Sequence, residues 1–373
     1  MKKIAVELLK WGLVILIFVY LFSRSLGTSS LREFCSAEKN WLFITLGFLC
    51  SLLPVLITFI RWGWLNTALG VRLSTGETIR LGFIGFVFNF LPMGIVGGDL
   101  VKGILLTRKN PTLKAECAAS VIVDRVIGLY AMFLVGLGGI LFTGFYRNTQ
   151  SEAVVATQAI YWLSGISTVG MLFLLWPSSG RDGRGRLFRK IPLVGGLLGK
   201  VYDACAIYQG KPGVMAISLS ATFAVHFLFS LSLWFLSLGL WEHAPSPTNH
   251  LVIYPVSNIG SMIPLSAGPM EFFLDQLYPL FPCVGGDPYQ LGHGMLVGIS
   301  YRIATVVIAG IGGIYYLLNR GEIGVALAQA KEENRRKNQG KTENTAIAKE
   351  PATDGQPILE EEELRAESEQ DHS

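Results

Sequence analysis

The best candidates for chemistry in this chain are four ionisable residues with a repeated spacing: Asp99, Arg125, Glu271 and Arg302. Each acid follows a proline by seven residues inside an apolar stretch, and each arginine lies in the next apolar segment. An unpaired charge at the centre of a bilayer costs about 2.5–3.5 kcal/mol. Guanidinium groups match phosphate oxygens in bidentate geometry. The pattern therefore predicts a phosphate-binding site, in which the acids orient the arginines or exchange a proton or cation. The alternative is that these charges only pair with each other and fasten helices together.

Two more charged residues belong to this candidate site. Asp124 directly precedes Arg125 and is a third carboxylate in the apolar region, while Lys102 follows the first acid by three residues. Lys102 either contacts a lipid phosphate at the inner surface or snorkels, laying its alkyl stem along apolar surface with its charge in water. Snorkelling is the simpler interpretation.

The backbone around both acids is predicted to be broken. A proline cannot donate to the helix ladder, and neighbouring glycines loosen it further. In lipid, broken backbone is tolerated only inside protein or beside a water-filled cavity. Half-helix N-termini at such breaks would point at a bound anion, and Asn89 and Asn258 are placed to bond the freed backbone groups. We assign the geometry of the two breaks to Asn89, Pro92, Gly97, Gly98, Pro264 and Gly268.

The composition is that of an integral membrane protein. Hydrophobic residues make up 51% of the chain and charged residues 16%, with a mean hydropathy of +0.45. Several apolar runs are long enough to cross a bilayer core. The formal net charge of +4 reports membrane topology in such a protein, so we expect no nucleic-acid partner.

The distribution of Lys and Arg predicts the topology through the positive-inside rule. The segments expected in the cytoplasm are the N-terminus, 61–80, 102–114, 181–211 and the chain beyond 319. The segments poor in basic residues, expected outside, are 24–40, 146–152, 242–250 and 282–290.

The sides assigned to successive loops agree with one another only if each broken region enters and leaves on the same side of the membrane. The predicted fold is an all-α membrane protein with about six spanning helices, an uncleaved first span at Trp11–Phe22 and two re-entrant hairpins. Hairpin 79–106 enters from the cytoplasm and hairpin 251–281 from outside. Oppositely oriented repeats that meet near the midplane are how many transporters build a substrate site.

Two domains are expected: a membrane domain over 1–320 and a polar, largely disordered cytoplasmic tail over 321–373. The expected location is the inner membrane, with both termini in the cytoplasm. Cys35 and Cys283 both fall in outer loops, which leaves open a disulfide between them or, as we favour, free thiols.

The residues also suggest a family. The pattern Pro92-x4-Gly97-Gly98-Asp99-x2-Lys102, then Ser120-x3-Asp124-Arg125, then Pro264-x3-Gly268-x2-Glu271 and Arg302 resembles the lysylphosphatidylglycerol synthase transmembrane region, a flippase-like membrane domain. The resemblance covers about 5–320. Departures are Gly-Gly-Asp where the family often has Gly-Glu, and Pro269 where relatives often keep Gly.

In two-domain relatives, a soluble aminoacyl-transferase domain modifies the lipid and the membrane domain is linked to its flipping. We expect no such domain here, because the polar segment after the last span is too short to build a core that binds tRNA. The chain also lacks Gly-x-Ser-x-Gly, His-Glu-x-x-His, Walker and dinucleotide motifs, so neither a catalytic site nor a cofactor or metal is expected.

Three functions remain open. The favoured one is transport of an anionic phospholipid or polyprenyl-phosphate lipid between leaflets. The second is a non-transporting membrane partner of a lipid- or glycan-modifying enzyme. The third is a membrane-embedded transferase with Asp99 or Glu271 as general base, which is disfavoured because both acids lie inside hairpins rather than in surface loops.

Overall fold

The computed structural model describes residues 29–90, 97–175, 195–263 and 267–321, with single residues or short stretches within 12–23, at 189 and 265, and within 323–332. Residues 1–323 group as one compact unit and 324–373 as another, and the helical bundle is the first of these units. The predicted tail (321–373) lies almost entirely outside the described residues. Of the predicted first span (Trp11–Phe22), residues 12, 15–17, 19 and 20 are described, and they are helical.

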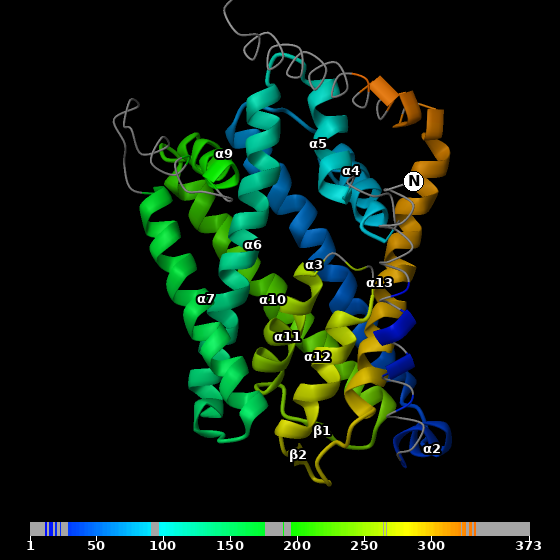
Figure 1. Ribbon diagram of the computed structural model, residues 1–373. Coiled ribbons are helices and arrows are strands. Elements are labelled where there is room, and N and C mark those ends of the chain that lie inside the picture. The colour runs from blue at the N-terminus through cyan, green and yellow to red at the C-terminus, as the bar shows by residue number, and fades with distance from the viewer. Residues whose placement is uncertain are drawn as a thin grey trace, which may run out of the picture. The chain divides into compact units, whose positions relative to one another are not determined.

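The described chain is nearly all helix, which confirms the predicted all-α membrane protein (Figure 1). Its helices are α2 (Ser29–Ser36), α3 (Trp41–Ala68), α4 (Thr75–Phe88), α5 (Gly98–Lys109), α6 (Lys114–Thr143), α7 (Ser151–Leu175), α9 (Gly195–Ala206), α10 (Pro212–Leu240), α11 (His250–Ile259), α12 (Pro269–Leu277) and α13 (His293–Leu318). Three short 3-10 helices lie at Phe145–Arg147, Gly260–Met262 and Tyr278–Leu280. Strands β1 (Ala244–Pro245) and β2 (Cys283–Val284) form an antiparallel pair.

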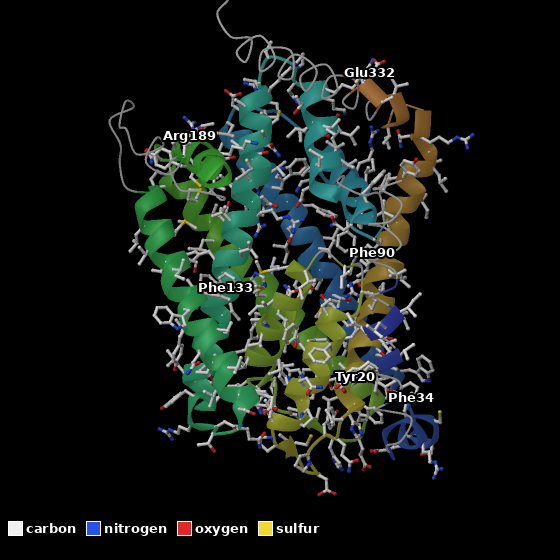
Figure 2. All side chains as sticks on the ribbon, in the orientation of Figure 1. Tyr20, Phe34, Phe90, Phe133, Arg189 and Glu332 are labelled. Atoms are coloured by element: carbon white, nitrogen blue, oxygen red, sulfur yellow. The ribbon has the colours of Figure 1, made fainter. Side chains whose placement is uncertain are left out.

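Four of the described helices, α3, α6, α10 and α13, are long and apolar enough to cross a membrane. The predicted span Ala153–Trp176 corresponds to α7, which lies along α6 (Figure 1). Ser164 on α7 donates a hydrogen bond of 3.0 Å to the carbonyl oxygen of Phe133 on α6, a residue labelled in Figure 2. The predicted total of six spans stays a prediction.

Helices α3 and α10 pack against each other as an antiparallel pair. Near the start of α3, Gly47 accepts a hydrogen bond of 2.8 Å from Ser232, and a Cβ at Gly47 would lie 2.8 Å from the side chain of Leu236. Near the end of α3, the carbonyl oxygen of Leu65 accepts a hydrogen bond of 3.1 Å from Tyr208, which precedes α10. The two helices therefore run in opposite directions and end at opposite ends of the bundle.

Helices α4 and α5 form the first hairpin. Ser74 and Glu77 make a capping box at the start of α4, and Lys109 at the end of α5 forms an ion pair of 2.6 Å with Glu77. The bonds from Lys109 and from the backbone N–H of Ser74 hold the pKa of Glu77 below its usual value. Because the start of α4 meets the end of α5, the chain enters and leaves on the same side.

At the tip of this hairpin, the N–H of Gly98 donates to the side-chain oxygen of Asn89 at 3.0 Å. Asn89 therefore bonds a backbone group next to the break, as its position in the sequence suggests. Asn258 instead donates to the sulfur of Met132 at 3.1 Å. The prolines assigned to the breaks, Pro92 and Pro264, lie outside the described residues.

Helices α11 and α12 form the second hairpin. His250 at the start of α11 hydrogen-bonds to the hydroxyl of Tyr278 just after α12, at 3.1 Å. At the tip, a Cβ at Gly260 would lie 2.9 Å from the carbonyl oxygen of Pro269. Since hairpin one follows the end of α3 and hairpin two follows the end of α10, they open toward opposite ends of the bundle (Figure 1).

The end at which the second hairpin opens carries β1, β2 and α2. Phe34 on α2 contacts Trp241 edge-on at 5.8 Å between ring centroids, and Figure 2 labels it there. All five cysteines are free, so Cys35 and Cys283 form no disulfide.

Candidate functional site

The first hairpin and α6 bring a group of charged side chains together. In the first turn of α5, Asp99 forms an ion pair with Arg125 of α6. One helical turn later, Lys102 lies 3.5 Å from a carboxylate oxygen of Asp99 and 3.6 Å from one of Asp124. Its ammonium also lies 4.4 Å from the ring centroid of Trp62, a cation–π distance. Lys102 thus joins two carboxylates over an aromatic face.

The snorkelling interpretation of Lys102 is therefore wrong. Its side chain is only 7% exposed, because it lies on the face of α5 that packs against α3 and α6 rather than on the face toward the bulk solvent. Two carboxylates and an aromatic ring replace the water that a snorkelling lysine would reach.

Arg61 of α3 completes the group. Its Nε and Nη2 donate to one oxygen of Asp124 at 3.1 and 2.9 Å, and Nη2 also reaches the Asp124 carbonyl at 3.1 Å. Its Nη1 donates to Thr222 of α10 at 2.5 Å. Both side chains of this ion pair are at most 4% exposed. Three helices, α3, α6 and α10, meet at this arginine.

Sequence reasoning missed Arg61 because it assigned the segment 61–80 to the cytoplasm on account of its basic residues. The structure corrects this: α3 continues to Ala68, and Arg61 lies inside the bundle. The signal in the sequence was the run from Trp62 to Leu65, which stays mainly apolar after the arginine.

We call Arg61, Lys102, Arg125, Asp99 and Asp124 the charged cluster. It contains three cations and two carboxylates, which leaves one positive charge in excess. Arg125 is its open end, with 57% of its side chain exposed, whereas Asp124, Lys102 and Arg61 are almost completely buried.

The second hairpin and α13 build a smaller, neutral site. Glu271 accepts from Arg302 Nε at 2.7 Å with one oxygen and from the N–H of Gly268 at 2.8 Å with the other. The carboxylate is 1% exposed and Arg302 is 25% exposed. Gly268 has φ +105°, a conformation that favours glycine. Pro269 at the first helical position fits there because that N–H has no helical partner.

The two arginines were expected to face one cavity. Among the described residues, no hydrogen bond or ion pair joins the charged cluster to the Glu271–Arg302 pair. Each arginine pairs with the acid of its own hairpin because it lies on the helix that follows that hairpin. Helix α13 contacts both hairpins, at Gly298 and at Gly312, and the helical rise places Arg302 about 15 Å along the axis from Gly312.

The buried Glu271–Arg302 pair should contribute measurably to stability. Replacing Glu271 with Gln keeps an oxygen for the Gly268 N–H but leaves Arg302 without its counter-charge, so the free energy of unfolding should fall by about 1–3 kcal/mol. The matched control is Asp203→Asn, which removes the exposed ion pair between Asp203 and Arg189; the Asp203 side chain is 52% exposed. This change should lower the free energy of unfolding by about 0–1 kcal/mol. Unfolding in mixed micelles measures both; equal losses would contradict the prediction.

Comparison with known protein families identifies the family of this chain. A family model described as the lysylphosphatidylglycerol synthase TM region matches residues 8–313. The chain belongs to this family. The match contains both hairpins, the charged cluster and Arg302, so it confirms the resemblance seen in the sequence and the assignment as a multi-pass membrane protein. No curated protein and no solved structure matches the chain.

Proposed function

We propose that this member of the lysylphosphatidylglycerol synthase TM region family is a flippase-like transporter that moves an anionic lipid, or a lipid-linked headgroup, between the leaflets of the inner membrane. The observation that carries the proposal is the charge of the cluster, three cations against two carboxylates.

An anionic headgroup would neutralise the excess positive charge of the cluster. An uncompensated charge at bilayer depth costs about 2.5–3.5 kcal/mol, and one phosphate charge at the cluster would offset it. The half-exposed Arg125 is the group that a headgroup can reach first. Its guanidinium holds a phosphate with two parallel hydrogen bonds. When phosphate displaces Asp99 from Arg125, Lys102 still neutralises the released carboxylate at 3.5 Å.

The two hairpins supply a route across the membrane. They open toward opposite ends of the bundle, and both pack on α13. Transporters built from inverted repeats alternate access by rocking one part against the other. In this mechanism the headgroup passes from the charged cluster toward Arg302 while the acyl chains stay in lipid.

The ion pairs favour transport over transferase chemistry. Asp99, Asp124 and Glu271 each accept from a cation, and an engaged carboxylate is a weak general base. They act here as counter-charges that hold arginine and lysine side chains in place. The basic residues at the open end of the first hairpin, Arg108 and Lys109, favour a cytoplasmic orientation for that end.

Proteoliposomes test the proposal. Fluorescent anionic, zwitterionic and polyprenyl-phosphate lipids are compared for movement between leaflets. We expect anionic lipids to move, and Arg125→Gln and Arg302→Gln each to slow transport by roughly tenfold or more, since each removes a charge-assisted hydrogen bond. Arg189→Gln is the control, because Arg189 (labelled in Figure 2) forms an exposed ion pair that belongs neither to the charged cluster nor to the Glu271–Arg302 pair.

Two results would overturn the proposal. Undiminished transport in folded Arg125→Gln and Arg302→Gln protein would remove these arginines from the mechanism. If the unaltered protein moved none of the lipids, and a lipid- or glycan-modifying enzyme lost activity when this chain was deleted, the protein would be a non-transporting partner of that enzyme.

A further inference from the structure

A second basic site lies apart from the charged cluster, at the open end of the first hairpin. A cavity of about 190 Å³ lies between α4, α5 and the segment that follows α13. Arg80 of α4 and Arg108 and Lys109 of α5 line it. Lys109 also forms the ion pair of 2.6 Å with Glu77, which is not one of the lining residues.

The rest of the lining is apolar and buried. Leu81, Ile84, Leu105 and Ile323 form it, and each is at most 5% exposed. The cavity thus has an apolar floor beside basic side chains. An apolar wall does not favour a free inorganic anion, whereas the glycerol carbons next to a lipid phosphate can pack against such a wall.

The size of the cavity limits its occupant. A water molecule takes about 30 Å³ of liquid volume, so the cavity has room for about six waters. That space holds a phosphate with a few neighbouring atoms, and it is smaller than the roughly 300–1,000 Å³ of sites that enclose whole ligands. The acyl chains of a bound lipid would remain in the bilayer.

Basic residues in the last turn of α5 also complement the negative end of its helix dipole. That role explains Arg108 and Lys109. It does not explain Arg80, which lies in the first half of α4, or the cavity that all three side chains line. Basic pockets between helices on the cytoplasmic side bind the phosphate of anionic lipids, which are concentrated in that leaflet.

We propose that this cavity, lined by Arg80, Arg108 and Lys109, holds the phosphate headgroup of an anionic lipid of the adjoining leaflet, at a site distinct from the charged cluster. The bound lipid is a retained ligand rather than the transported one.

Native mass spectrometry of the full chain in detergent tests this. Phosphatidylglycerol is the probe, with phosphatidylcholine of the same acyl chains as the uncharged comparison. We expect one phosphatidylglycerol to be retained, and Arg80→Gln/Arg108→Gln to weaken its binding by roughly tenfold or more. The Lys double variant, Arg80→Lys/Arg108→Lys, should lose less, because it keeps the charge but not the guanidinium fork.

The control removes the same charge outside the cavity. Arg72 and Lys114 are exposed residues that do not line it, and Arg72→Gln/Lys114→Gln should bind as the unaltered protein does. Unchanged binding in the Arg80/Arg108 variant, or an equal loss in this control, would overturn the proposal. Equal competition by inorganic phosphate would show a phosphate site without lipid specificity, which overturns the lipid assignment.

The result is separate from the transport mechanism. Arg125→Gln leaves the cavity intact, so it should retain this lipid even if transport is lost. Loss of the lipid in Arg125→Gln would mean that the detected molecule occupies the charged cluster, and the assignment to the cavity would be wrong.

Discussion

Replacing Arg61 with Met should lower the free energy of unfolding by about 3–5 kcal/mol, the usual cost of removing one partner of a buried ion pair. Arg61 gives Asp124 three hydrogen bonds of 2.9–3.1 Å, and both side chains are almost fully buried. Lys102 would remain as a partner of Asp124, but at 3.6 Å it replaces only part of this interaction. Thr222 would also lose its donor.

A double variant separates this cost from simple loss of contacts. Arg61→Met/Asp124→Leu removes the whole pair, so no unpaired carboxylate is left, and it should be more stable than Arg61→Met alone. Arg72→Met, at an exposed position, is the control and should change stability by less than about 0.5 kcal/mol. Reversible unfolding in mixed micelles measures all three. A double variant less stable than the single one would contradict the argument.

The hairpins could be predicted from the sequence because lipid makes broken backbone costly. A proline, glycines and an acid inside an apolar stretch conflict with a plain spanning helix, and two such stretches conflict with the distribution of basic residues unless both turn back. Pairing of each acid with an arginine could also be predicted, because the apolar segments offer Asp99 and Glu271 few other charged partners.

Arg61 and Lys102 could not be placed in the same way. Both adjoin basic segments, and the positive-inside rule treats such residues as parts of a loop. Their burial depends on which helix faces meet in three dimensions: α5 places Lys102 over Trp62, and α10 brings Thr222 to Arg61. The sequence therefore predicted one site shared by both hairpins, with as many basic as acidic residues. Packing instead adds Arg61 to the charges at the first hairpin, which gives that cluster an excess positive charge, and it leaves Glu271 and Arg302 as a separate pair.

Two glycines lie where helices approach each other closely. A Cβ at Gly98 would lie 1.8 Å from the carbonyl oxygen of Gly85, and one at Gly312 would lie 2.1 Å from that of Phe83. The first contact joins α5 to α4 and the second joins α4 to α13. Many glycines in the chain have open space around them instead, so glycine content does not identify the positions that matter.

Gly98→Ala should therefore separate the arms of the first hairpin. The new methyl group overlaps backbone, which cannot rotate away, and it also crowds Asn89, whose oxygen would be 2.6 Å from it. Overpacking of this kind costs about 1–3 kcal/mol, sometimes more. Because Asp99 and Lys102 follow on the same helix, the charged cluster should be displaced, and anionic lipid transport should fall by roughly tenfold or more.

The neighbouring glycine is a matched control. A Cβ at Gly97 meets nothing within 4 Å, and its φ of −70° suits any residue. Gly97→Ala should keep both stability and transport. Gly312→Ala and Gly313→Ala repeat the comparison where α4 packs on α13, since a Cβ at Gly313 also meets nothing within 4 Å. If Gly98→Ala and Gly97→Ala were equally active, close contact between α4 and α5 would not be what positions the charged cluster.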